Sequence, residues 1–367
     1  GSNKRDPRFF DVYKLSVDGY ASKMIYQNND GLNFSGMSND ENFFALSKSL
    51  NTNDSDLFLY DVKTKEMIKI NDNQSANSAQ DFSEDNTTFY YTTDDGGEFA
   101  YLMSYDLKTK EKKKVMAKSW DIMGIGFTRN GKYMVVYTNE DGKNAIEVLD
   151  AQTMTPIALP DFDDKSITSV AFSDNEAWMR MYVGGSNAPS DLYAYNLETK
   201  EQYKLTTVLN NEIEAEDLVN AKVIRFKSFD GTEIPAIYYV PQQASVAHKV
   251  PAMVWVHGGP GGQTRQNFSS LIQYMVNHGY AVLAVNNRGS SGYGKTFYKM
   301  DDKNHGEKDL QDCVEGKNWL ATQPEIDGSK IGIIGGSYGG YMTMAALTYT
   351  PEEFAVGVNL FGVTNWM

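Results

Sequence analysis

The chain contains very little cysteine and histidine, and it has no long apolar stretch. A single cysteine, Cys313, in 367 residues excludes a disulfide within the chain. The four histidines are scattered along the sequence, so their spacing predicts no zinc site. No run of about 18 apolar residues occurs, so no membrane-spanning helix is predicted. We therefore expect no metal, no cofactor and no membrane partner.

Basic residues are also few relative to acidic ones. The sequence holds 34 Lys and Arg against 48 Asp and Glu, which gives a formal net charge of -14. A surface this acidic repels the phosphate backbone of nucleic acids, so no nucleic-acid partner is expected. No signal peptide is visible, which leaves a periplasmic and a cytoplasmic location both open. The oligomeric state is not indicated.

The first two hundred residues contain a repeat with a period of about 45 residues. One marker is a Met or Phe followed by Ser or Thr, and its copies begin at Met37, Phe82, Phe127 and Phe172. A second marker is an Asp or Asn with a Thr three residues later, which is hairpin-turn chemistry. Its copies lie in phase with the first, at Asp61, Asp106, Asp150 and Asn196. A period near 45 with about four short strands per unit is typical of β-propeller blades.

We predict a partial β-propeller over residues 1–210. Its complete blades are expected at residues 32–71, 73–116, 119–160 and 164–206, and the end of a further blade at 11–26. One blade alone has too little core, and stacking against its neighbours buries its apolar faces. The residues that open the four copies of the first marker are expected at equivalent positions of consecutive blades, packed between neighbouring sheets. The alternative is an ordinary β-sandwich, which four copies in phase disfavour. A ring needs more members or must close at a low blade number, and we expect a larger propeller.

After an acidic linker the pattern changes to buried strands that alternate with helices, which we assign to a domain over residues 217–367. The predicted strands are 223–229, 234–240, 250–256, 281–285, 331–334 and 354–360, and the predicted helices are 268–277, 309–322 and 338–347. Asp230-Gly231 joins the first two strands and indicates a hairpin. The alternation is typical of a mostly parallel sheet with helices on both faces. Cys313, at helical spacing in the second helix, is interpreted as a buried structural thiol.

A glycine-rich turn follows the strand 331–334 and opens a helix. The turn, Gly335-Gly336-Ser337-Tyr338-Gly339, contains the G-x-S-x-G pattern that exposes the nucleophilic serine of α/β-hydrolases. The serine backbone is strained there, and a Cβ at Gly335 or Gly339 would collide with the neighbouring turn. The pattern alone is a weak signal, but the strand before it and the helix after it are the context it requires. We therefore predict that Ser337 is the nucleophile rather than an inert turn residue.

A second glycine-rich loop, His-Gly-Gly-Pro-Gly-Gly at residues 257–262, directly follows the strand 250–256. In α/β-hydrolases a loop at this place supplies one oxyanion donor, and the N–H after the nucleophile, here of Tyr338, supplies the other. Each donor contributes about 3–4 kcal/mol of transition-state stabilisation. The alternative is a loop that merely turns. His257 belongs to this loop and precedes the serine, so it is not interpreted as the general base.

Taken together, these segments resemble the prolyl oligopeptidase family of serine peptidases. The resemblance rests on the order of the motifs: the repeats, then Phe-Asp-Gly-Thr at 229–232, the loop 257–262, Asn-Arg-Gly-Ser-Ser-Gly-Tyr-Gly at 287–294, and the turn 335–341. It implies a seven- or eight-bladed propeller that covers an α/β-hydrolase domain. It also implies cleavage of short peptides, which the propeller admits while it excludes folded proteins. The segment 287–289 is interpreted as structural support near the site.

The resemblance also assigns roles to single positions. Ser337 matches the nucleophile, and the Tyr338 N–H matches the first oxyanion donor. In prolyl oligopeptidases proper and in dipeptidyl peptidases a tyrosine side chain is the second donor, where this sequence has His257. The His257-Gly258-Gly259 loop looks more like the acylaminoacyl-peptidase branch, in which a backbone N–H, here that of Gly259, is the donor.

The remaining members of a catalytic triad are missing after Ser337. In α/β-hydrolases the triad follows the order Ser, then Asp or Glu, then His. The 30 residues after Ser337 contain no Asp and no His, and all four histidines precede it. We therefore expect an α/β-hydrolase domain that lacks its last strands, with the triad Asp and His beyond residue 367. A chain without them is expected to be inactive by itself.

The predicted function is that of a serine peptidase that hydrolyses short peptides through an acyl-enzyme on Ser337. Two alternatives stay open: an esterase or lipase on the same fold, which the propeller disfavours, and a propeller scaffold whose hydrolase domain is degenerate. Ester and peptide substrates separate the first alternative from a peptidase. A fluorophosphonate probe separates the second, because a scaffold would not be labelled. Residue preference and the choice between exo- and endopeptidase are not indicated.

Overall fold

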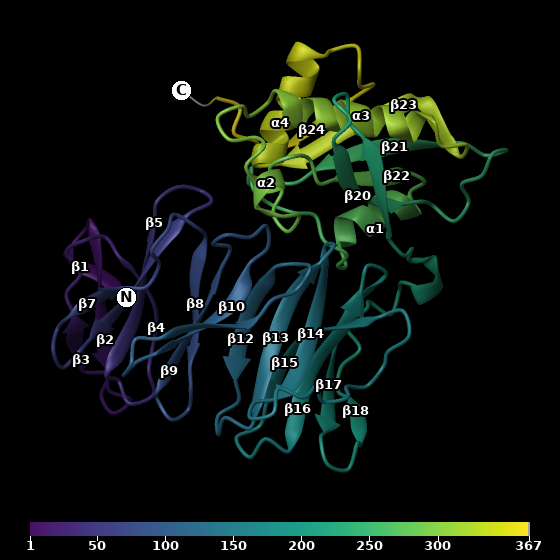
Figure 1. Cartoon of the computed structure of the whole chain (residues 1–367). Coiled ribbons are helices and arrows are strands. Elements are labelled where there is room, and N and C mark those ends of the chain that lie inside the picture. The colour runs from purple at the N-terminus through teal and green to yellow at the C-terminus, as the bar shows by residue number, and fades with distance from the viewer. Residues whose placement is uncertain (366–367) are drawn as a thin grey trace. The chain divides into compact units, whose positions relative to one another are not determined.

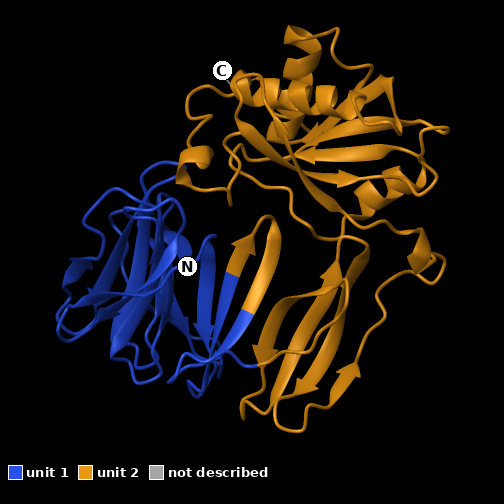
Figure 2. Ribbon diagram, turned by 45° about the vertical axis from the view of Figure 1, so that its right-hand side comes forward, with its two compact units in different colours: residues 1–137, 147–157 blue, residues 138–146, 158–367 orange. Residues whose placement is uncertain are grey.

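A computed structural model describes residues 1–365 of the chain (Figure 1). The chain forms two compact units, residues 1–137 with 147–157 and residues 138–146 with 158–367 (Figure 2). This division does not test the predicted domain boundary between residues 210 and 217, which stays a prediction. Within the described part of the chain, no helix is long and apolar enough to cross a membrane.

The first unit begins with small antiparallel sheets that follow one another along the sequence. Their strands are β1 (Ser2–Asp6), β2 (Phe9–Leu15), β3 (Ser22–Tyr26), β4 (Asn33–Met37), β5 (Phe43–Ser49), β6 (Ser55–Asp61), β7 (Met67–Lys69), β8 (Asn77–Phe82), β9 (Thr88–Thr93), β10 (Tyr101–Asp106) and β11 (Lys112–Met116). The sheet orders are β1-β2-β3, β4-β5-β6-β7 and β11-β10-β9-β8. In each sheet a strand pairs with its neighbour in sequence, which is the meander of a propeller blade.

Two further sheets continue the series. The third predicted blade holds β12 (Ile122–Phe127), β13 (Tyr133–Glu140) and β14 (Lys143–Asp150), and the fourth holds β15 (Ser166–Phe172), β16 (Trp178–Gly185), β17 (Ala188–Asn196) and β18 (Gln202–Lys204). The third sheet has three strands where four were predicted. A single bridge between Leu149 and Pro156 stands in place of the fourth strand. Pro156 has no N–H to donate to a ladder, which accounts for the shortened pairing.

The first repeat marker occupies the same position in each of the four sheets. Met37, Phe82, Phe127 and Phe172 are the last residues of β4, β8, β12 and β15. The predicted equivalence of the four positions is therefore confirmed. Phe82 is buried, and the Phe127 ring lies 5.1 Å from the ring of Tyr90 in the preceding sheet. The expected packing is wrong for Met37, because 43% of its surface is exposed.

The second repeat marker closes a hairpin, as predicted. In β6–β7 the Oδ1 atom of Asp61 accepts the N–H groups of Lys63 at 2.8 Å and of Thr64 at 3.0 Å. The same pair of bonds recurs at Asp106, Asp150 and Asn196. The residue four positions after the marker has a positive φ in every copy, at Lys65, Lys110, Met154 and Lys200. The side-chain acceptor thus fixes a turn that includes one left-handed residue.

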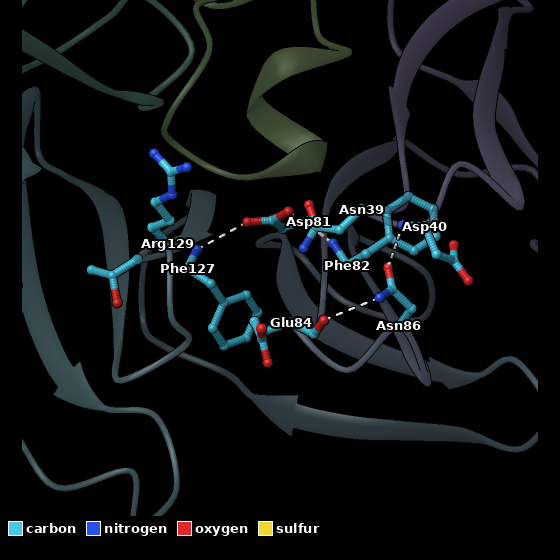
Figure 3. Close-up of a pocket in the computed structure, with 9 residues that line it drawn as sticks. Asn39, Asp40, Asp81, Phe82, Glu84, Asn86, Phe127 and Arg129 are labelled. Carbon is cyan, nitrogen blue, oxygen red and sulfur yellow. Dashed lines mark hydrogen bonds between the residues drawn. The ribbon is translucent and has the colours of Figure 1, made fainter. Parts of the chain in front are cut away.

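Corresponding turns of three successive sheets surround a polar hollow of about 530 Å³ in the first unit (Figure 3). The Phe127 N–H donates to Asp81 at 2.9 Å, and the Asp40 N–H donates to Asn86 at 3.2 Å. Each bond joins one sheet to the next in the series. Apolar side chains from β5, β6, β8, β9 and β10 form a shared core between the β4–β7 and β8–β11 sheets. Stacking of this kind gives each small sheet the core that it lacks alone.

The C-terminal part of the chain forms one six-stranded sheet with the order β19-β20-β22-β21-β23-β24. Its strands are β19 (Lys222–Lys227), β20 (Glu233–Tyr239), β21 (Val250–Val256), β22 (Ala281–Val285), β23 (Ile326–Gly336) and β24 (Gly357–Leu360). The first two strands form the predicted antiparallel hairpin, and β22, β21, β23 and β24 run parallel. A short 3-10 helix, Ala215–Asp217, precedes the sheet.

Helices cover both faces of this sheet, as the alternating pattern predicts (Figure 1). They are α1 (Ser270–Asn277), α2 (Lys295–Tyr298), α3 (Lys308–Ala321) and α4 (Tyr338–Tyr349). On one face, apolar residues of α3 and α4 pack on Leu283, Val254 and Ile333 of the central strands. On the other face, Ile272 and Val276 of α1 pack on alternate residues of β20 and β22. The α/β-hydrolase arrangement is therefore confirmed.

Cys313 belongs to the first of these two cores. It is fully buried in α3, and burial raises the pKa of its thiol. A thiol that stays protonated and has no access to solvent is not a nucleophile. This agrees with its interpretation as a structural residue.

The hairpin turns allow a direct test of the repeat. We expect Asp61→Ala to lower the free energy of unfolding by about 1 kcal/mol, because two turn N–H groups lose their acceptor. Asp61→Asn should cost much less, since Asn196 makes the same two bonds in the fourth copy. Urea unfolding of the two variants measures the difference. Equal destabilisation by Ala and Asn would show that the side-chain acceptor is not what holds the turn.

Candidate active site

Ser337 lies at the junction of β23 and α4. Its backbone has φ 55° and ψ -117°, a conformation that residues other than glycine rarely adopt. Ser337 itself is exposed, while Gly335 before it and Tyr338 after it are buried. Its N–H donates to the carbonyl oxygen of Leu360, and its carbonyl oxygen accepts the N–H of Val363, both at 3.2 Å. The surrounding strands thus hold a strained residue so that it projects from the end of the sheet.

Two glycines make this turn possible. A Cβ atom on Gly335 would lie 2.4 Å from the carbonyl oxygen of Gly339, inside the same turn. A Cβ atom on Gly339 would lie 2.1 Å from the carbonyl oxygen of Val256, at the end of β21. Both distances are far below van der Waals contact. The turn is therefore pressed against the end of the neighbouring strand, and only glycine fits at either position.

The loop 257–262 leaves the end of β21 and passes directly beside the serine. A Cβ atom on Gly258 would lie 4.0 Å from the Ser337 Oγ. Gly259 has φ 139°, and a Cβ there would come within 2.4 Å of the Gly262 nitrogen. The two glycine-rich segments singled out in the sequence are thus brought together. Their proximity is the requirement for a shared oxyanion site, since its donors must reach the same oxygen.

His257 is buried, and its hydrogen bonds are made with groups other than Ser337. Its Nδ1 lies 2.7 Å from the carbonyl oxygen of Gly258, and its Nε2 lies 2.8 Å from the Ser290 Oγ. The residue is buried, and burial lowers the pKa of its imidazole. Because both ring nitrogens are engaged, His257 is not available to take a proton from Ser337. This supports its interpretation as part of the loop.

The loop beyond Gly262 is also hydrogen-bonded to the β13–β14 hairpin. Gln263 accepts a hydrogen bond from Asn139 at 2.9 Å, and the Gln266 N–H donates to the carbonyl oxygen of Gly142 at 2.9 Å. Both partners lie at the tip of the β13–β14 hairpin, within the second compact unit. A cavity of about 610 Å³ opens beside this loop and is bordered by Gly258 and Gly336, next to the serine.

Arg288, in the segment 287–289 that is interpreted as structural support, is the centre of a buried hydrogen-bond network. Its guanidinium donates to both oxygens of Asp312, at 2.9 and 2.8 Å, and to Asp230 in the β19–β20 turn. The Ser228 hydroxyl adds a bond of 2.6 Å to Asp312. The Arg288 side chain is 3% exposed and that of Asp312 is fully buried. The hydrogen bonds from Arg288 hold the pKa of the Asp230 carboxyl far below its usual range. This network joins the hairpin turn, the end of β22 and α3.

The side chain of Tyr338 contacts a second, largely buried cluster of polar residues. Its hydroxyl donates a hydrogen bond to Asp309 in the first turn of α3, and burial raises the pKa of the phenol. Asp301, His305 and Asp309 lie together here, although none of them was predicted as a site residue. Each is four residues from the next. This regular spacing of two Asp and one His is a signal for a metal site that a pattern of histidine and cysteine alone does not include.

Ser337 has no activating partner in residues 1–365. Within that range its hydroxyl makes no hydrogen bond, and none of the four imidazoles is bonded to it. A serine hydroxyl without an adjacent base keeps its proton near neutral pH and is a weak nucleophile. The described residues therefore supply a candidate nucleophile and a candidate oxyanion site without a base.

The Arg288 network predicts a large loss of stability when its cation is removed. We expect Arg288→Met to lower the free energy of unfolding by about 3–5 kcal/mol, because the buried Asp312 carboxylate is left unpaired. Arg288→Met combined with Asp312→Leu should recover part of this loss. As a control, Lys330→Met removes an exposed ion pair with Asp327 and should leave stability nearly unchanged. Chemical denaturation that gave Arg288→Met and Lys330→Met the same small effect would contradict the prediction.

Comparison with known families agrees with this geometry. Residues 10–208 match the family described as the N-terminal β-propeller domain of prolyl oligopeptidase, and residues 266–367 match the prolyl oligopeptidase family. A dipeptidyl aminopeptidase BIII from Pseudoxanthomonas mexicana is 28% identical over 77% of this chain and 42% of its own length. Dipeptidyl peptidase family member 6 from Caenorhabditis elegans is 24% identical over 100% of the chain and 54% of its own length. The chain thus spans about half the length of the curated relatives it matches.

Solved structures show the same fold. A puromycin-hydrolyzing peptidase from Mycobacterium tuberculosis aligns with a TM-score of 0.79 at 17% identity, covering 95% of this chain and 55% of that one. A dipeptidyl peptidase 4 from Porphyromonas gingivalis aligns with a TM-score of 0.74 at 19% identity, covering 96% and 52%. The propeller match alone covers more than half of the chain, and it precedes the hydrolase match in the order that the motifs predict. The chain belongs to the prolyl oligopeptidase family.

Proposed function

We propose that this chain is part of a serine peptidase that hydrolyses short peptides, with Ser337 as its nucleophile. One observation carries the proposal: a strained, exposed serine projects from the end of a buried strand, directly beside a second glycine-rich loop. That combination is the nucleophile elbow of an α/β-hydrolase. Family membership supports peptide bonds as the target, and the matched relatives include dipeptidyl aminopeptidases.

In the proposed reaction the Ser337 Oγ attacks the carbonyl carbon of the scissile peptide bond while a base removes its proton. The carbonyl oxygen becomes an oxyanion, which accepts hydrogen bonds from the N–H groups of Tyr338 and Gly259. The C–N bond then breaks, the amine leaves with the proton, and an acyl-enzyme ester remains on Ser337. Water hydrolyses this ester by the same steps in reverse order. The strained elbow and the close approach of Gly258 support these roles.

The base and the acid that orients it are proposed to lie outside this chain. His257 is committed to Gly258 and Ser290, and the triad order of α/β-hydrolases places both missing residues after the nucleophile. We propose that the longer protein supplies an Asp and a His beyond residue 367, and that residues 1–367 alone are inactive. The cavity of about 610 Å³ bordered by Gly258 and Gly336 is the proposed place for substrate groups next to the scissile bond.

The proposed activity predicts a clear difference between three proteins. The longer protein should release p-nitroaniline from short peptide p-nitroanilides, and its Ser337→Ala variant should lose nearly all of this activity. Residues 1–367 should show no detectable turnover, because no base activates the serine. Steady-state assays of the three proteins test the proposal. Turnover that is unchanged in Ser337→Ala would remove Ser337 as the nucleophile, and faster cleavage of esters than of peptides would favour an esterase.

The oxyanion assignment predicts a loss of rate without a loss of the nucleophile. In the longer protein, Gly259→Ala should lower kcat by about 10²–10³-fold, because the added Cβ would displace the loop that carries the proposed donor. Gly126→Ala is the matched control, since a Cβ there meets nothing within 4 Å. Peptide turnover measures both. An unchanged kcat for Gly259→Ala would show that this loop donates no oxyanion hydrogen bond.

A further inference from the structure

Three side chains that could bind a metal converge behind the elbow. Asp301 and His305 lie in the segment between α2 and α3, and Asp309 lies in the first turn of α3. One donor atom from each residue lies within 4.8 Å of the others. An imidazole nitrogen and two carboxylate oxygens are thus brought close together. Such a donor set suits zinc and similar divalent ions.

The two carboxylates of this group are buried. The Asp301 side chain is 4% exposed, and Asp309 is fully buried. Two like charges held close together in a poorly solvated place repel each other, and a shared cation removes the repulsion. His305, whose side chain is 32% exposed, lies at the outer side of the group. The group therefore lies close to the surface on this side.

One buried carboxylate oxygen of this group, on Asp301, lacks a hydrogen-bond partner among the described residues. The Oδ2 atom of Asp301 is buried and accepts no hydrogen bond from residues 1–365. The Nδ1 atom of His305 lies 3.3 Å from this oxygen. Buried carboxylate oxygens almost always have a partner, so this atom calls for a ligand.

The surroundings hold both carboxylates in place. Gly289 has φ 90° and lies so close that a Cβ there would be 2.1 Å from the Cγ atom of Asp301. The Asp309 Oδ1 accepts the N–H of Gly306 at 2.9 Å, and its Oδ2 accepts the Tyr338 hydroxyl. Hydrogen bonds of this kind commonly orient the carboxylate ligands of metal ions.

We propose that Asp301, His305 and Asp309 bind a divalent transition-metal ion, with Zn²⁺ as the representative. Three protein ligands with water as a fourth make a common zinc coordination. Ca²⁺ and Mg²⁺ fit less well, because both prefer oxygen ligands alone. A bound ion would join the segment 301–305 to α3 and would lie next to the Asp309 carboxylate that holds Tyr338. The proposal does not depend on the proposed peptidase activity.

Isothermal titration of Zn²⁺ into the chain, after treatment with EDTA and dialysis, tests this site. We expect one ion to bind per chain. Asp301→Asn and His305→Ala should each raise the Kd by at least about 100-fold, because each removes a direct ligand. His305 is partly exposed, so its variant should fold even if Asp301→Asn does not. Excess Mg²⁺ should not compete.

Two control variants separate this site from binding elsewhere on an acidic surface. His278→Ala removes an exposed imidazole that is bonded to the Tyr274 carbonyl oxygen, and Asp302→Asn removes an exposed carboxylate beside the site. Both should keep the Kd of the unmodified chain. The absence of Zn²⁺ binding would overturn the proposal. So would binding that His305→Ala leaves unchanged or that His278→Ala abolishes.

Discussion

The close approach of the β23–α4 turn to the end of β21 is the constraint on which the rest of the site depends. Gly339 lies so near the Val256 carbonyl oxygen that no Cβ fits between them. This contact brings the elbow and the loop 257–262, which begins where β21 ends, to the same edge of the sheet. Ser337, with its positive φ, lies in the same turn. The strain is local, and the buried parallel strands on both sides offset its cost.

Buried polar networks fix the segments around this edge. Arg288 ties the β19–β20 turn to α3 through Asp230 and Asp312, and His257 is anchored to Ser290. The Tyr338 hydroxyl reaches Asp309 on the same helix, α3. The backbone N–H proposed as an oxyanion donor therefore belongs to a residue, Tyr338, whose side chain is fixed by a hydrogen bond to α3. Rigid support of this kind is what preorganised hydrogen-bond donors require.

Local signals in the sequence predicted most of the fold and the centre of the site. The repeat markers identified the hairpin turns, because Asp61 and its counterparts act on N–H groups two and three residues away. The elbow was predicted because the glycines it needs are adjacent in sequence. Among the elements that were missed or shortened, the four-residue helix α2 shows no periodicity, and the polar residues 327–330 hid the first half of β23.

Long-range partners could not be read from the sequence. The bonds of Arg288 join residues 58 and 24 positions away, and no local pattern marks them. The group of Asp301, His305 and Asp309 was missed for another reason. Its members lie partly outside any regular helix, so their even spacing alone does not predict that they converge. Their meeting depends on how the segment between α2 and α3 folds back against the first turn of α3.

The central claim is that Ser337 is the nucleophile of a peptidase, and chemical labelling tests it most directly. A fluorophosphonate phosphonylates only a serine that its surroundings activate, and mass spectrometry of the peptides from a digest identifies the modified residue. In the longer protein, the account predicts a single adduct on Ser337, which a short peptide substrate slows. An adduct on another serine, or no adduct in a protein that cleaves peptides, would contradict it.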